Sequence, residues 1–159
     1  IKVILYKVNA IDPTDVEMLN EYYFETMHHE FAHILHQKKN YPTEYNQISA
    51  ADYSSTGWQN RTEQQAWKLG FVTPYAGMEP QEDFVEVIAN YLVKPDGFWE
   101  NMLANAGTEG ATKIQTKFDM VKEWLMTAWN IDIDELRTII IRRSGDIDSI
   151  LNEKIAYNE

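Results

Sequence analysis

The sequence has no cysteine, which excludes disulfide bridges and metal sites built from thiolates. Positive charge is scarce: 14 Lys and Arg residues stand against 25 Asp and Glu residues, so the net charge is -11. An acidic domain repels phosphate backbones, and we therefore expect no nucleic acid partner. No apolar run approaches the length of a membrane span, and no signal peptide or lipidation motif is present. We expect no membrane span in this chain.

The 159 residues have the composition of a globular protein, with 44% hydrophobic and 13% aromatic residues. This is enough for one domain with a substantial core, so we expect a single domain over residues 1–159 and a monomer. The chain opens directly on strand-like sequence, which suggests that its natural N-terminus is missing.

The first third of the chain predicts one strand and one long helix. Residues 1–8 are β-branched and apolar enough for a strand. A helical pattern starts after Asp12 and ends near Asn40, with a break near Asn20 as an alternative. Residues 41–58 are polar and predict a loop with short helical turns. Together with the helices that follow, this gives a mainly helical α+β fold.

Helix signals dominate the rest of the chain. A capping box at Thr62 to Gln65 opens a helix that Gly70 closes, and Pro80 opens the next one. Ser144–Gly145 is predicted to separate the last two helices. The predicted helices run over residues 62–70, 80–94, 98–106, 112–130, 134–143 and 146–156.

One motif carries the chemistry of the sequence. His29-Glu30-Phe31-Ala32-His33 reads H-E-x-x-H, and residues four apart lie on one face of a helix. His29 and His33 can therefore bind one zinc ion, with Glu30 placed to act on a water that the metal holds. The alternative is a chance match on a surface helix.

A third ligand is needed, and two layouts can be tested by counting. One needs Gly three residues and His six residues after the second histidine, where this chain has His36 and Lys39, so that layout fails. The other takes a Glu from a later helix. Here the chain offers Glu82, Asp83 and Glu86.

Glu82 and Glu86 lie on one helical face, so one can bind the metal while the other accepts a hydrogen bond from a ligand histidine. We predict Zn²⁺ bound by His29, His33 and Glu82, with Glu86 as the supporting acid. Asp83 and Glu86 stay open as alternative ligands. The competing interpretation is a solvated acidic first turn that complements the helix dipole.

Tyr75 lies in the turn that leads into the helix of Glu82, where its hydroxyl could donate a hydrogen bond at the open metal position. The alternative is a tyrosine packed on the core. His28 is expected at the surface or behind a ligand, and His36 in the core or at the rim of the site. Trp58 is expected in the core or lining a substrate cleft.

The combination of His29 to His33 with Glu82 resembles the gluzincin arrangement of metallopeptidases. The order of Tyr75, Glu82 and Glu86 is similar to that in lethal-factor-type zinc proteases. The whole chain resembles a family of putative zinc metallopeptidases, described as substrate-import-associated zinc metallohydrolase lipoproteins of Bacteroides-type bacteria. The segments that carry this resemblance are residues 29–37, 70–76, 82–86 and 129–137.

The resemblance implies a zincin-like domain and a zinc-dependent peptidase that acts on a peptide or protein substrate. Glu30 would be the general base and Tyr75 the catalytic tyrosine. It also implies a periplasmic or cell-surface lipoprotein of the outer membrane, beside a nutrient import system. The alternative is a zinc-containing binding or assembly module without catalysis, and a third possibility is a helical interaction domain without metal.

Overall fold

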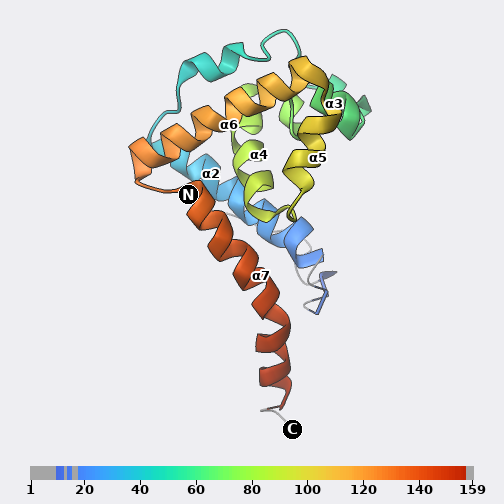
Figure 1. Ribbon diagram of the computed structural model, residues 1–159, viewed down its shortest axis with the longest axis vertical. Coiled ribbons are helices and arrows are strands. Elements are labelled where there is room, and N and C mark those ends of the chain that lie inside the picture. Colours follow the sequence, from blue (N-terminus) through green and yellow to red (C-terminus); the bar gives the residue numbers. More distant parts are fainter. Residues whose placement is uncertain (1–9, 13, 16–17, 157–159) are drawn as a thin grey trace.

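The computed structural model describes residues 10–12, 14–15 and 18–156, and the side chains of these except at residues 21 and 147–156. Every regular element in this part of the chain is a helix (Figure 1). In chain order these are η2 (Leu19–Phe24, π-helical), α2 (Glu25–Lys38), the 3₁₀ turns η3 (Thr43–Gln47) and η4 (Gly57–Asn60), α3 (Glu63–Leu69), the 3₁₀ turn η5 (Tyr75–Gly77), α4 (Pro80–Val93), α5 (Phe98–Asn105), α6 (Gly107–Trp129) and α7 (Ile133–Ala156).

The mainly helical character is as predicted, but the α+β class is not supported. The strand predicted at residues 1–8 lies outside the described residues, and the residues that the structure describes contain no strand. None of the described helices is long and apolar enough to cross a bilayer.

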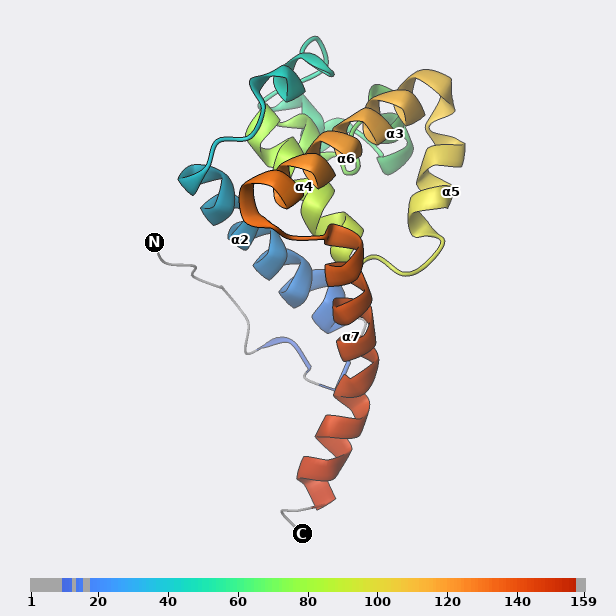
Figure 2. The same ribbon diagram turned by 60° about the vertical axis from the view of Figure 1, so that its left-hand side comes forward.

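Helix α4 is the centre of the fold. It packs along α2 on one side, against α6 on another and against α7 near its C-terminal end (Figures 1 and 2). Ten of its 14 residues are buried, so it is enclosed on most of its circumference. The apolar core around it includes Phe84, Val87, Ile114 and Leu125. A helix fixed in this way gives its first turn a defined position for a functional site.

Local signals set the boundaries of α3 and α4 as the sequence predicts. The Thr62 side chain accepts a hydrogen bond from Gln65 N, and the Gln65 side chain accepts one from Thr62 N. Gly70 ends α3 at φ +89°, a left-handed conformation that glycine adopts without a steric penalty. Pro80 occupies the first turn of α4, where its missing N–H has no helical partner to lose.

Two predicted boundaries are wrong. Helix α6 begins at Gly107, five residues before the predicted start at Thr112. Helix α7 continues through Ser144 and Gly145 to Ala156. The helix penalty of a serine or glycine is at most about 1 kcal/mol, which the flanking helix formers can outweigh. The Asn20 side chain also donates a 2.6 Å hydrogen bond to Ser144 Oγ.

The predicted helix that ends near Asn40 is present, but it changes its winding. The segment Leu19–Phe24 is π-helical, and α2 then runs regularly to Lys38. The alternative break near Asn20 is therefore a change of helical period rather than an interruption.

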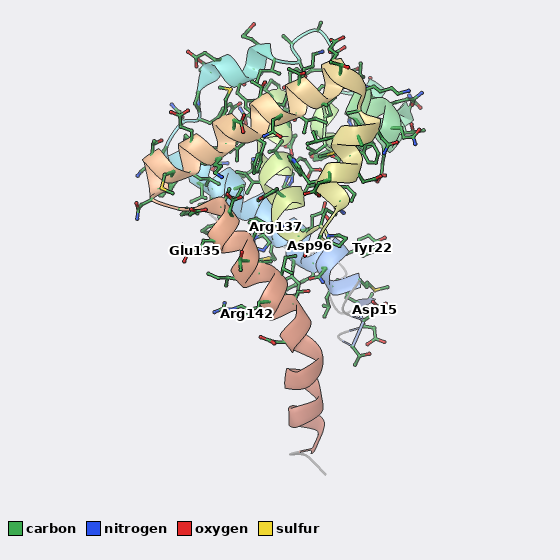
Figure 3. The ribbon with its side chains drawn as sticks, viewed as in Figure 1. Asp15, Tyr22, Asp96, Glu135, Arg137 and Arg142 are labelled. Atoms are coloured by element: carbon green, nitrogen blue, oxygen red, sulfur yellow. The ribbon has the colours of Figure 1, made fainter. Side chains whose placement is uncertain are left out.

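Polar side chains attach α7 to the C-terminal end of α4: the Tyr91 hydroxyl donates to Asp134 Oδ1 at 2.6 Å, and Arg137 makes three hydrogen bonds. Arg137 Nη2 donates hydrogen bonds to the Lys94 carbonyl at 2.8 Å and to Asp96 Oδ1 at 3.0 Å, and Nη1 donates to the Tyr91 carbonyl. Figure 3 shows Arg137 and Asp96 where α7 meets the α4–α5 connection. Farther along, α7 contacts η2 through the hydrogen bond from Asn20 to Ser144, and its C-terminal part then extends away from the other helices (Figures 1 and 2).

Candidate metal centre

Three potential ligands from two helices converge on one point. His29 and His33 lie one turn apart on the face of α2 that packs on α4, and Glu82 lies in the first turn of α4. His29 Nε2 is 3.2 Å from His33 Nε2. Glu82 Oε2 is 3.1 Å from His29 Nε2 and 3.3 Å from His33 Nε2. The three atoms form an almost equilateral triangle.

This triangle has the dimensions that a zinc ion requires. Tetrahedral zinc with nitrogen and oxygen ligands at about 2.0–2.1 Å separates those ligands by about 3.3–3.4 Å. The observed separations of 3.1 to 3.3 Å are close to that edge length. Two imidazoles and one carboxylate are also the ligand set of many catalytic zinc sites, which keep a fourth position open.

The imidazole of His29 is oriented from behind by an acid. His29 Nδ1 donates a hydrogen bond to Glu86 Oε1 at 2.7 Å, which leaves Nε2 free to face Glu82 and His33. Glu86 is buried on α4, one turn after Glu82. A carboxylate in this position fixes the ring and its tautomer and makes the imidazole a better ligand.

The imidazole of His33 has a different partner. His33 Nδ1 lies 2.9 Å from Nε2 of His36, a buried residue. Burial is the largest effect on the His36 imidazole and lowers its pKa, so that ring stays neutral and can accept the His33 Nδ1 proton. The prediction of a core or rim position for His36 is consistent with this burial. Each ligand histidine thus has a partner at its outer nitrogen.

Charge at the centre favours a cation. Burial lowers the pKa of His29, but hydrogen bonds and negative charge from Glu82 and Glu86 outweigh it and raise the pKa to about 9. Burial raises the pKa of Glu82, but its hydrogen bonds with His29 and His33 lower it well below its usual range. The carboxylates of Glu82 and Glu86 therefore favour positive charge at the centre, and a metal ion and a proton would compete for it.

The two alternative acids point elsewhere. Asp83 is fully buried on another face of α4, about 100° round the helix from Glu82, where its Oδ2 is 2.6 Å from Lys117 Nζ and accepts a hydrogen bond from Tyr53 at 2.7 Å. Glu86 is engaged with the outer nitrogen of His29. Glu82 is the acid that completes a potential metal-binding group with His29 and His33 among the described residues. Zinc binding by these residues stays a prediction.

A cavity of about 270 Å³ opens beside the predicted ligand His29. Glu30 and Tyr75 both line it, together with Glu25, Thr26, His29 and Glu86. The Tyr75 ring lies 6.0 Å from the His29 ring and 5.0 Å from the Trp58 ring, measured between centroids. Burial and the nearby Glu82 carboxylate raise the pKa of Tyr75 to about 12, so its hydroxyl keeps its proton at neutral pH.

Trp58 and His28 lie close to the site but are not among the residues that line this cavity. Trp58 is half-buried against Tyr75. His28 is half-buried, and burial lowers the pKa of its imidazole.

Comparison with known proteins identifies the family. A family model described as "putative zinc-binding metallo-peptidase" matches residues 1–134. The chain belongs to this family. It is also similar to the crystal structure of a putative zinc-binding metallo-peptidase from Bacteroides caccae, with 52% sequence identity and a TM-score of 0.85. That similarity covers 91% of this chain and 56% of the other, so the chain spans little more than half the length of its relative. No curated protein matches the chain.

All six predicted site residues lie within the part that matches the zinc-binding metallo-peptidase family. Two further residues were not predicted from the sequence: Thr73, which lies behind the centre, and Lys117, which lies in the core next to α4. Thr73 donates a hydrogen bond to Glu86, and Lys117 forms a buried ion pair with Asp83. No short sequence pattern indicates either contact, because each one joins side chains from different parts of the fold.

Proposed function

We propose that this member of the zinc-binding metallo-peptidase family is a zinc-dependent peptidase. The observation that carries the proposal is the triangle of His29, His33 and Glu82, with Glu30 at the edge of the adjoining cavity. A purely structural zinc site has no need of a base next to its ligands or of an open cavity beside them.

His29, His33 and Glu82 would hold the ion. Zinc, when bound, lowers the pKa of a coordinated water toward neutrality and polarises the carbonyl of the peptide bond. Glu30 lines the cavity next to His29, and no hydrogen bond or ion pair to another described residue occupies its carboxylate. This carboxylate can therefore accept the proton of the attacking water and pass it to the nitrogen of the leaving amine.

Tyr75 would stabilise the negative charge that develops on the carbonyl oxygen. Its ring lies next to the ligand His29, and its pKa is raised from the usual value near 10 to about 12, so its hydroxyl stays protonated well into the alkaline range. A protonated hydroxyl donates a hydrogen bond, and one donor aimed at such an oxygen contributes about 3 kcal/mol to catalysis.

The test is a digest of a mixed peptide library by metal-loaded protein, with and without a chelator. We expect cleavage that the chelator abolishes and that Glu30→Gln reduces by several orders of magnitude while zinc content and melting temperature stay unchanged. Glu44→Gln makes the same chemical change at an exposed position outside the site and serves as control. Unchanged cleavage in metal-loaded Glu30→Gln would refute the role of Glu30. Stoichiometric zinc without cleavage would favour the non-catalytic binding module.

We also propose a periplasmic or cell-surface location at the outer membrane, beside a nutrient import system, and a monomeric protein acting on peptide or protein substrates rather than nucleic acid. The resemblance to import-associated lipoproteins supports the location, and the net charge of -11 disfavours nucleic acid. Fractionation of the native cells tests the location, and light scattering tests the monomer. Recovery of the protein in the cytoplasmic fraction would contradict the proposed location.

A further inference from the structure

Thr73 makes two hydrogen bonds through one hydroxyl group. Its Oγ1 donates to Glu86 Oε2 at 2.5 Å and accepts from the backbone N–H of Ala76 at 3.1 Å. A hydroxyl has a single proton, so donation to Glu86 leaves its lone pairs for the amide of Ala76. Both bonds can therefore form at the same time, because the hydroxyl donates in one and accepts in the other.

The same acid also holds a predicted metal ligand. Glu86 accepts from Thr73 on Oε2 and from His29 Nδ1 on Oε1, the latter at 2.7 Å. A continuous series of hydrogen bonds therefore runs from the backbone of Ala76, through Thr73 and Glu86, to the imidazole of His29. The bonds from Ala76 N–H to Thr73 and from Thr73 to Glu86 run in one direction, so donation by Ala76 makes the Thr73 hydroxyl a better donor. Glu86 is the common acceptor of Thr73 and His29, so the position of its carboxylate depends on both.

The turn at the far end of this series carries Tyr75. The residues from Thr73 to Met78 form a tight turn in which Gly77 N donates to the Pro74 carbonyl at 3.0 Å and Met78 N donates to the Tyr75 carbonyl at 2.9 Å. In the chain Tyr75 lies between Thr73 and Ala76, the two residues that the hydrogen bond from Ala76 N to Thr73 Oγ1 joins. The backbone that carries the Tyr75 side chain is therefore part of the turn that Thr73 closes.

We propose that Thr73 is a positioning residue that couples metal binding at His29 to the placement of Tyr75. The inference rests on the proposed metal site. Metal binding orders the His29 ring, that order passes through Glu86 to the Thr73 hydroxyl, and the hydroxyl holds the turn. Coupling of this kind is reciprocal, so loss of the hydroxyl weakens metal binding and also loosens the turn.

The first measurement is zinc affinity by competition with a chromogenic chelator. Thr73→Val keeps the β-branched shape and removes the hydroxyl. We expect it to weaken zinc binding by about tenfold, because loss of a hydrogen-bond partner behind a metal ligand typically costs about 10–100-fold in affinity. Thr73→Ser restores the hydroxyl and should return the affinity to within about threefold of the wild type. Thr127→Val is the matched control, because its hydroxyl bonds only to the Glu123 carbonyl on an exposed face of α6.

The second measurement reports on the turn itself. Amide hydrogen exchange of Gly77 and Met78 is followed by NMR with and without zinc. In the wild type and in Thr73→Ser, zinc should slow both amides by about tenfold, the size of a modest coupling free energy. In Thr73→Val zinc should leave their exchange unchanged. Neither amide bonds to Thr73, so the loss of zinc dependence cannot come from a deleted partner.

The outcomes separate this inference from the proposed function. Wild-type zinc affinity in Thr73→Val, or zinc-dependent protection that survives in it, overturns the coupling while leaving the peptidase proposal intact. A wild-type protein that binds no zinc overturns both. If Thr73→Val fails to fold, the wild type and Thr73→Ser decide: the absence of zinc-dependent protection at Gly77 and Met78 in these two proteins overturns the coupling.

Discussion

Replacement of Lys117 by methionine should destabilise the protein strongly and in a pH-dependent way. Lys117 is completely buried, with its Nζ 2.6 Å from Asp83 Oδ2, 2.7 Å from the Gly70 carbonyl and 4.3 Å from the centre of the Phe71 ring. Methionine has a similar length and no charge. The substitution therefore removes the cation and leaves the Asp83 carboxylate buried without its ionic partner.

The size of the destabilisation depends on whether Asp83 stays charged or takes up a proton. Breaking a buried ion pair by removing one partner typically costs about 3–5 kcal/mol. The carboxyl can avoid carrying an unpaired charge by taking up a proton, which costs about 4 kcal/mol at pH 7 when the reference pKa is about 3.9. We therefore expect Lys117→Met to lower the free energy of unfolding by about 4 kcal/mol at pH 7.

The sign of the pH dependence follows from counting protons. In Lys117→Met the folded state holds one proton on Asp83, whose pKa is raised, and the unfolded state has released it above a pH of about 5. Relative to the wild type, the free energy of unfolding of the variant should therefore rise by about 1.4 kcal/mol for each unit by which the pH is lowered from 7 to 5. In the wild type the pair binds the same number of protons folded and unfolded, so it contributes no such slope.

The assay is urea denaturation at pH 7, 6 and 5, in the presence of a chelator so that metal binding does not contribute. The double variant Asp83→Asn with Lys117→Met removes both charges, and we expect it to be at least about 2 kcal/mol more stable than Lys117→Met at pH 7. If Lys117→Met lowers the free energy of unfolding by less than about 1 kcal/mol, as surface substitutions and exposed ion pairs do, the buried ion pair is refuted. A loss independent of pH would refute the protonation of Asp83.

Three further predictions concern the metal centre. Tyr75→Phe should lower kcat by about a hundredfold, with zinc content and melting temperature unchanged, and wild-type kcat would refute the donor role. Glu82→Ala should lose zinc, Glu86→Gln should bind zinc about 10–100-fold more weakly, and Asp83→Asn should keep it. If metal analysis shows that Asp83→Asn loses zinc while Glu82→Ala keeps it, Glu82 is not the third ligand. Zinc at a free concentration of 100 times its Kd should raise the free energy of unfolding by about 2.7 kcal/mol, and a melting curve insensitive to both zinc and chelator would contradict a metal site.

The parts of the molecule that the sequence predicts are those set by neighbouring residues. Helical spacing places His29 and His33 on one face, and the capping box at Thr62 and the turn signal at Gly70 define α3. The same spacing places Glu82 and Glu86 on a common side of α4. These relations depend on a few consecutive residues, so one sequence is enough to see them.

The contacts that could not be predicted join residues far apart in the chain. Lys117 follows Asp83 by more than thirty positions, and a lysine is normally taken as exposed, so nothing in the sequence indicates that both are fully buried. The continuation of α7 through Ser144 and Gly145 was not predicted because the flanking helix formers outweigh a local turn signal that costs at most about 1 kcal/mol. The role of Thr73 likewise depends on the approach of its turn to α4.

The first two turns of α4 carry three acids with three different surroundings, and this has a consequence for insertions and deletions. Glu82, Asp83 and Glu86 face the metal site, the buried lysine and His29, respectively. Adding or removing one residue between Pro80 and Glu86 would rotate the following acids by about 100° and exchange their surroundings. The exposed connection at Ser55 and Thr56 has no such constraint. Natural length variation among relatives should therefore accumulate in that connection and be absent from the start of α4.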